Sequence, residues 1–140
     1  MKPPPIAPRI TQVAVTAWLS TRGWRAFGFQ RQVWKAMLEG RSGLLHASTG
    51  TGKTLAVWLG ALIALGKGQP GTGAAAPPCA VLWITPMRAL ASDTLRALAE
   101  PLAALAPAWS SGLRSGDTSQ SQRSAQDRRL PTVLVTTPET

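Results

Sequence analysis

The stretch that most restricts the fold of this chain is "LLHASTGTGKT", which runs from Leu44 to Thr54. An apolar run ends there in small, hydroxylic and glycine residues, and a lysine and a threonine follow. Residues 47–54 match the phosphate-binding pattern G-x-x-x-x-G-K-[ST] at every position except the first, where Ala47 replaces glycine. Because this loop connects a strand to a helix, it predicts an α/β fold.

Strands and helices alternate along the rest of the chain. Apolar runs predict buried strands at 43–48, 80–86 and 132–138, with a weaker strand within 107–116. Helical spacing predicts helices at 11–19, 30–38, 53–65, about 88–105 and 120–129. This alternation predicts a mainly parallel sheet with helices on both faces. We expect residues 1–9 to be a disordered, proline-rich lead-in and residues 10–140 to form one domain.

Composition limits the partners and the compartment. Lys and Arg number 15 against 6 Asp and Glu, a net charge of +9 that favours nucleic acid first and an anionic membrane second. Solubility alone explains the charge equally well. The single Cys79 excludes an intramolecular disulfide and fits a reducing, cytoplasmic setting. We expect this cysteine to be buried at the start of a strand. The longest apolar run, Leu55–Leu65, is too short to span a bilayer, so we expect no membrane anchor.

The glycine-rich loop has the residue types that hold a polyphosphate. Gly50 and Gly52 can adopt backbone angles that turn successive N–H groups toward one oxyanion, and the following helix adds its N-terminal N–H groups. Lys53 can reach the terminal phosphates, and the Thr54 hydroxyl can bind Mg²⁺. A dinucleotide pattern would need glycine where Leu55 stands. A strand-to-helix turn without a ligand is the alternative, but the order of strand, loop and helix favours a nucleoside triphosphate with Mg²⁺.

Upstream residues are candidates for binding the base. The amide of Gln30 can both donate to and accept from an adenine edge, and Trp24 or Phe27 could stack on the ring. For any one aromatic residue, core packing is the commoner role. We expect the other histidine and tryptophan candidates to be packed residues, namely His46 beneath the loop and the core residues Trp34, Trp58 and Trp83.

Downstream, charged and hydroxyl side chains follow the predicted strands. Arg88 falls where a strand has ended and a helix begins, which suits a phosphate clamp. Arg114, Thr118, Arg123 and Thr136–Thr137 are further residues suited to a sugar-phosphate backbone. Each arginine alone is more often a solvated surface charge, and their shared placement after strands favours a binding role.

The ordered set "FQRQVW", "ASTGTGKT", "TPMRAL", "SGDTS" and "TTPE" resembles the first motor domain of a superfamily 2 DEAD/DEAH-box helicase. More narrowly, the chain from about Gly23 to its last residue resembles the large-helicase-related group, especially the DNA ligase-associated DEXH-box helicases of bacteria. The resemblance implies a RecA-like P-loop NTPase fold and an ATP-dependent DNA helicase that translocates on single-stranded DNA. It also implies a nucleoid-associated location in the bacterial cytoplasm and DNA-ligase-associated repair partners.

The resemblance also implies roles for individual positions. Gln30 matches the adenine-sensing glutamine, and Lys53 and Thr54 match catalytic positions of motif I, in which alanine at the first position is usual. The implied ATP-binding residues of motif I are Ala47, Ser48, Thr49, Gly50, Thr51, Gly52, Lys53 and Thr54. The implied single-strand contacts are Pro86, Arg88, Ala89, Gly116, Asp117, Thr137, Pro138 and Glu139.

Motif II, an Asp-Glu pair that such helicases need for hydrolysis, does not follow "TTPET". We therefore expect an N-terminal part of a longer protein, truncated before the motif II strand. Alone, it should be hydrolytically inactive, marginally stable and aggregation-prone, with exposed apolar residues on the 54–65 helix. Two other functions stay open: a nucleic-acid-binding module without motor action, and a P-loop NTPase of another class, such as a kinase or a transporter ATPase.

Overall fold

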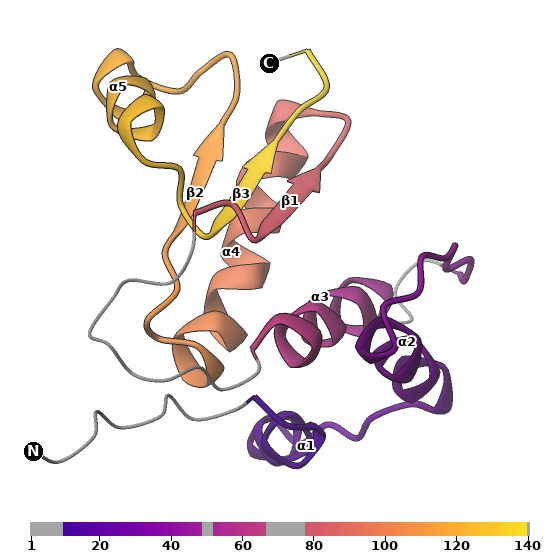
Figure 1. Cartoon of the computed structure of the whole chain (residues 1–140). Helices are drawn as coiled ribbons and strands as arrows, with labels where there is room; N and C mark the ends of the chain where they lie inside the picture. Colours follow the sequence, from indigo (N-terminus) through magenta and orange to yellow (C-terminus); the bar gives the residue numbers. More distant parts are fainter. Residues whose placement is uncertain (1–9, 49–51, 67–77, 140) are drawn as a thin grey trace, which may run out of the picture. The chain divides into compact units, whose positions relative to one another are not determined.

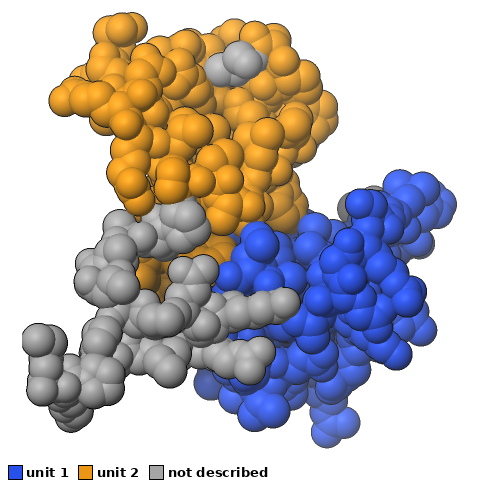
Figure 2. All heavy atoms as spheres, viewed as in Figure 1, with its two compact units in different colours: residues 1–73 blue, residues 74–140 orange. Residues whose placement is uncertain are grey.

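The computed structural model describes residues 10–48, 52–66 and 78–139 and divides the chain into two compact units, residues 1–73 and 74–140 (Figures 1 and 2). The elements are α1 (Gln12–Thr21), α2 (Gly28–Leu38), α3 (Lys53–Leu65), β1 (Val81–Ile84), α4 (Arg88–Leu105), β2 (Ser111–Arg114), α5 (Gln120–Arg128) and β3 (Val133–Thr136). The proline-rich lead-in expected at 1–9 lies outside the described residues.

In the first unit, α1 begins at a side-chain cap and ends in a turn closed by backbone hydrogen bonds. Thr11 is the N-cap, and its hydroxyl accepts a hydrogen bond from the Ala14 amide at 3.1 Å. Trp18 and Leu19 are among the buried residues of this helix. After the helix the chain turns at Gly23, which has a φ of +73°, and the Trp24 amide donates back to the Leu19 carbonyl at 2.9 Å. The helix expected at 11–19 is confirmed.

Helices α2 and α3 pack against each other in the same unit. Gly60 permits this close approach, because a Cβ there would lie 2.6 Å from Met37 Sδ and 3.3 Å from Trp34 Cδ1. Trp34 and Trp58 are completely buried, so their expected core positions are confirmed. The expectation of exposed apolar residues along the 54–65 helix is wrong for most of the helix, because α3 buries every residue from Trp58 to Ile63. Leu65 at its end is exposed as expected.

The strand expected at 43–48 is also wrong. These residues form no helix or strand, and the side chain of Leu44 is 92% exposed. A strand needs a neighbouring strand for its backbone hydrogen bonds, and the described residues of the first unit contain no other strand. His46 is consequently exposed, not packed beneath the loop.

The second unit holds a parallel sheet of order β1-β3-β2, as the alternation predicts (Figure 1). Val81 of β1 and Ser111 of β2 both pair with Val133 of the central strand β3. Helix α4 connects β1 to β2 and packs on β2 and β3, whereas α5 connects β2 to β3. Parallel strands require such crossovers, since a tight turn can join only antiparallel neighbours. The carboxyl ends of all three strands therefore lie at one end of the sheet.

Strand β1 lies at an edge of this sheet and exposes apolar side chains. Leu82 and Ile84 point to the same side of the strand and are 53% and 58% exposed. Trp83 is half-buried, so its expected core position is only partly reached, and Cys79 is half-buried before the strand with a φ of 45°. We call the side chains of Leu82 and Ile84 the β1 apolar face.

Candidate nucleotide and nucleic-acid sites

The glycine-rich loop ends at a residue whose conformation only glycine adopts readily. Gly52 is the N-cap of α3 and has a φ of +88°, in the left-handed region. A Cβ at this position would lie 2.7 Å from Nε2 of Gln30. The first N–H groups of α3 have no partner within the helix, and with the helix dipole they favour an anion at this end.

The lysine of the loop bonds to the other end of the same loop. Lys53 Nζ donates to the Ala47 carbonyl at 2.8 Å, and the side chain is half-buried. Thr54 follows in the first turn of α3 and is exposed. Thr49, Gly50 and Thr51 lie outside the described residues, so the inward turn of their amides stays a prediction.

Gln30 connects the start of α2 to the start of α3. This side chain is 3% exposed, its Nε2 donates to the Gly52 carbonyl at 3.1 Å, and its Oε1 accepts from the Phe27 amide at 2.9 Å. A glutamine amide has two N–H groups and an oxygen that accepts two hydrogen bonds. These two contacts therefore leave one donor and one acceptor for another group.

Of the two aromatic residues considered for base stacking, Phe27 is the one beside the loop. Phe27 is 58% exposed, and its Cδ2 lies 3.9 Å from the position that a Gly52 Cβ would occupy. Its ring is stacked on Phe29, with the centroids 5.9 Å apart and the planes 9° apart. Trp24 makes an edge contact with Trp18 of α1, at 6.2 Å between ring centroids. The position of Phe27 relative to Gly52 could not be read from sequence spacing.

In the second unit, the predicted single-strand contacts follow the three strand ends. Pro86, Arg88 and Ala89 come after β1, and Gly116 and Asp117 come after β2. All five are exposed. The parallel register brings these loops to the same end of the sheet as the loop after β3.

The loop after β3 holds the last three predicted contacts. Pro138 and Glu139 are exposed, whereas the side chain of Thr137 is 1% exposed. Hydrogen bonds from the residue's own backbone and from Thr137, with a smaller contribution from the Arg88 charge, lower the pKa of Glu139 below its ordinary value. This carboxyl is therefore ionised at neutral pH.

Arg88 lies between two carboxylates. Its Nη1 is 3.3 Å from Asp117 Oδ1, and its Nε is 3.9 Å from Glu139 Oε1. The guanidinium group lies against Gly116, where a Cβ would overlap Arg88 Nη2. Exposed arginine at the ends of parallel strands is suited to bind phosphate.

The other hydroxyl and arginine candidates are bonded within the second unit. Thr118 Oγ1 accepts from the Ser115 amide at 2.8 Å, and Thr136 Oγ1 donates to the Arg114 carbonyl at 2.7 Å. Arg123 donates to the Ser115 carbonyl at 2.7 Å, and Arg114 pairs with Asp127 at 2.9 Å. In this structure, these side chains hold the loops that follow the strands.

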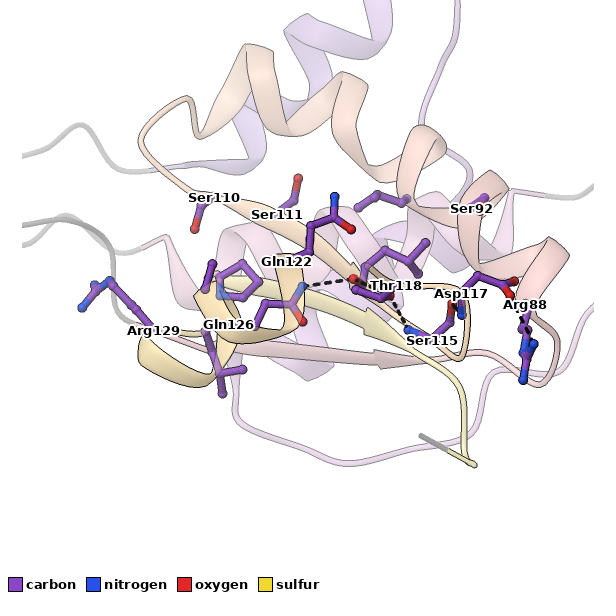
Figure 3. Close-up of a pocket in the computed structure, with 16 residues that line it drawn as sticks. Arg88, Ser92, Ser110, Ser111, Ser115, Asp117, Thr118, Gln122, Gln126 and Arg129 are labelled. Atoms are coloured by element: carbon purple, nitrogen blue, oxygen red, sulfur yellow. Dashed lines mark hydrogen bonds and ion pairs between the residues drawn. The ribbon is translucent and has the colours of Figure 1, made fainter. Parts of the chain in front are cut away.

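A cavity that sequence reasoning missed, lined by both polar and apolar residues, lies between α4, β2 and α5 (Figure 3). Its volume is about 750 Å³, and Arg88, Ser92, Ser111, Gln122 and Gln126 are among the residues that line it. Gln126 Nε2 donates to the Leu113 carbonyl at 3.0 Å. The run of serine and glutamine in 119–126 was the available signal, but only the packing of α5 beside β2 turns it into a cavity wall.

In the ranges 10–48, 52–66 and 78–139, no group of three or more His, Cys, Asp or Glu side chains could hold a metal ion. None of the helices in the described part of the chain is long and apolar enough to cross a membrane.

Two features precede the apolar helix α3, a left-handed glycine and a lysine bound to its own loop, and a parallel sheet follows in the chain. These features define the class of P-loop NTPases. The sequence profile of the DEAD/DEAH box helicases matches residues 27–140. The chain belongs to this family, and its fold is RecA-like.

Large helicase-related proteins are among the similar proteins. The chain is 38% identical over 137 residues to the Lhr helicase/probable uracil glycosylase of Mycolicibacterium smegmatis, covering 85% of this chain and 9% of that protein. It resembles the solved structure of Mycobacterium smegmatis helicase Lhr bound to ssDNA and AMP-PNP, with a TM-score of 0.72, 32% identity and coverage of 94% and 18%. The DUF1998 helicase MrfA bound to DNA and AMPPNP has the same fold, with a TM-score of 0.72, 23% identity and coverage of 99% and 19%. The chain thus spans less than a fifth of the length of these proteins.

Proposed function

We propose that this chain is the ATP-binding and single-strand-binding part of an ATP-dependent DNA helicase that couples hydrolysis to translocation on single-stranded DNA. The observation that carries the proposal is the Gln30 side chain, which accepts a hydrogen bond from the Phe27 amide and donates one to the Gly52 carbonyl of the phosphate loop. A base and a phosphate chain could thus be held by directly connected residues.

The free donor and acceptor of Gln30 favour adenine. Adenine offers an N7 acceptor beside an N6 amino donor, whereas guanine offers two acceptors on the same edge. One donor and one acceptor match the first pattern and mismatch the second. Phe27 is the better placed stacking residue, and Trp24 is the weaker candidate because it packs on Trp18.

The phosphates would lie at the start of α3. The amides of Gly50, Thr51 and Gly52, the Lys53 ammonium group and the helix dipole would hold them, and the Thr54 hydroxyl would bind Mg²⁺. The bound Mg²⁺ would neutralise charge on the terminal phosphates.

Single-stranded DNA would lie along the strand ends of the second unit. The exposed Arg88 and the net charge of +9 support phosphate contacts that are independent of base sequence and sensitive to salt. The ssDNA and AMP-PNP in the structure of M. smegmatis Lhr support the choice of both ligands. A nucleoid-associated location in the bacterial cytoplasm, and repair partners associated with DNA ligase, belong to the same proposal.

Binding of a fluorescent ATP analogue with Mg²⁺ tests the nucleotide site. We expect Lys53→Ala to weaken binding about tenfold or more, because a charge-assisted hydrogen bond to phosphate is lost. Lys35→Ala is the matched control, since Lys35 is an exposed lysine of α2 away from the loop, and its affinity should stay unchanged. Equal binding by the wild type and Lys53→Ala would contradict the proposal.

Repeating this titration with oligothymidylate separates the proposed function from a binding module without motor action. In a helicase part, the ATP analogue and the oligonucleotide should change each other's affinity, and Lys53→Ala should reduce that coupling. A simple binding module would hold the oligonucleotide equally well with or without the analogue, in both proteins.

A further inference from the structure

A charge cluster joins the loops after all three strands. Arg88 is the first residue of α4, Asp117 lies in the loop after β2, and Glu139 follows β3. The two carboxylates approach different nitrogens of Arg88, at 3.3 Å from Nη1 and 3.9 Å from Nε (Figure 3 shows Arg88 and Asp117). Gly116 lies against the guanidinium group of Arg88, which occupies the space that a side chain at position 116 would need.

Stability does not explain this cluster. The side chains of Arg88, Asp117 and Glu139 are 52%, 74% and 52% exposed, and ion pairs with such exposure contribute little to folding. The same guanidinium group is the proposed phosphate contact. A carboxylate and a phosphate bind guanidinium through the same N–H groups, so they compete for it.

We propose that Asp117 and Glu139 are internal competitors for phosphate at Arg88, an inference that rests on the proposed function. They bind the guanidinium group when no strand is present, and at least one of them releases it when a strand phosphate binds. In this proposal, and unlike the role that the family resemblance implies, the two carboxylates act through Arg88 and do not themselves contact the strand phosphate, because like charges repel. Each encounter with a phosphate therefore replaces one ion pair by another, which lowers the affinity at this position and favours rapid exchange along a strand.

Anisotropy of a fluorescein-labelled oligothymidylate tests the inference in the whole chain. The variants Asp117→Asn and Glu139→Gln keep the side-chain shape and remove one negative charge each. We expect each to raise the affinity about two- to fivefold, the size of an exposed ion pair. In an Arg88→Gln background, the gain should fall to nearly nothing, because no guanidinium group remains to be released.

Asp127→Asn is the matched control. Asp127 is an exposed aspartate that pairs with Arg114 at 2.9 Å, outside the cluster, and its loss changes the net charge equally. We expect a smaller gain in affinity for this variant than for Asp117→Asn. Circular dichroism of every variant verifies the fold, and the two independent cluster variants guard against a local defect in either one.

Each alternative result has a definite meaning. Weaker binding by Asp117→Asn and Glu139→Gln would overturn the inference, because the carboxylates would then position Arg88. A gain that persists in the Arg88→Gln background would also overturn it, because simple repulsion of the strand would explain the gain. A wild-type chain that does not bind the oligonucleotide would contradict both the proposed function and the inference. If the wild-type chain binds the oligonucleotide and the cluster variants bind it with the same affinity, only the inference is contradicted.

Discussion

At the scale of the residue, the hydrogen bonds of single side chains decide which groups the candidate sites present. Gly52 lies in the left-handed region, and Lys53 Nζ donates to the Ala47 carbonyl at 2.8 Å. Thr118 and Arg123 hold the loop after β2 by their hydrogen bonds. The motif pattern predicted the turn at Gly52 and Lys53, because spacing along the chain reports residue type and order. It did not predict the partners of Thr118 and Arg123, because these depend on how the loops fold.

The first prediction concerns Gly52. We expect Gly52→Ala to destabilise the first unit by about 1–2 kcal/mol or more, since an L-residue in the left-handed region is strained. The new Cβ would also lie 2.7 Å from Gln30 Nε2 and disturb the bond to the Gly52 carbonyl. Urea unfolding followed by circular dichroism measures the change.

Gly43→Ala is the control for this prediction. Gly43 has no atom within 4 Å of the added Cβ and no positive φ, so the free energy of unfolding should change little. If both alanine variants unfold at the same urea concentration, then the assignment of strain to Gly52 is incorrect.

At the scale of the element, the helices were more predictable than the strands. The helix expected at 53–65 has these bounds in the structure, and the helix at 30–38 begins only two residues earlier, at Gly28. Helical periodicity and a glycine at the end of a helix are local signals, so they predict helices in both units. The apolar run at 43–48 resembles a strand equally well, yet it forms none, because a strand also requires a partner that local sequence does not reveal.

The β1 apolar face allows a prediction about the sheet. We expect Ile84→Thr to reduce concentration-dependent association in light scattering and to change the free energy of unfolding by less than about 0.5 kcal/mol, because Ile84 is 58% exposed. Val135→Thr makes a comparable exchange in the central strand, where the side chain is completely buried. That control should cost about 1–3 kcal/mol, since it buries a hydroxyl group. Equal effects of the two exchanges would show that Ile84 is not exposed.

At the scale of the whole molecule, the chain combines a helical unit that carries the phosphate-loop motif with a unit of parallel strands. Its sequence has the ordered motifs of a DEAD/DEAH box helicase from the Q motif to "TTPE", but it contains no adjacent Asp-Glu pair. Hydrolysis in P-loop NTPases needs carboxylates that place the metal ion and the attacking water.

We predict that the purified chain binds the ATP analogue yet releases no phosphate from ATP above the rate of Lys53→Ala. A phosphate-release assay, with and without oligothymidylate, measures turnover in the preparation that was titrated for binding. Binding in that preparation shows that inactivity is not a failure to fold. Sustained turnover that vanishes in Lys53→Ala would refute the prediction.

The contact between Lys53 and the Ala47 carbonyl changes how such titrations are to be interpreted. The ammonium group already has a ligand before any nucleotide arrives, so an incoming phosphate exchanges partners with a backbone oxygen instead of meeting a bare charge. An observed dissociation constant thus reports the difference in free energy between Lys53 bound to phosphate and Lys53 bound to the Ala47 carbonyl. Replacing Lys53 therefore removes its hydrogen bond to the Ala47 carbonyl as well as the proposed contact with the phosphate.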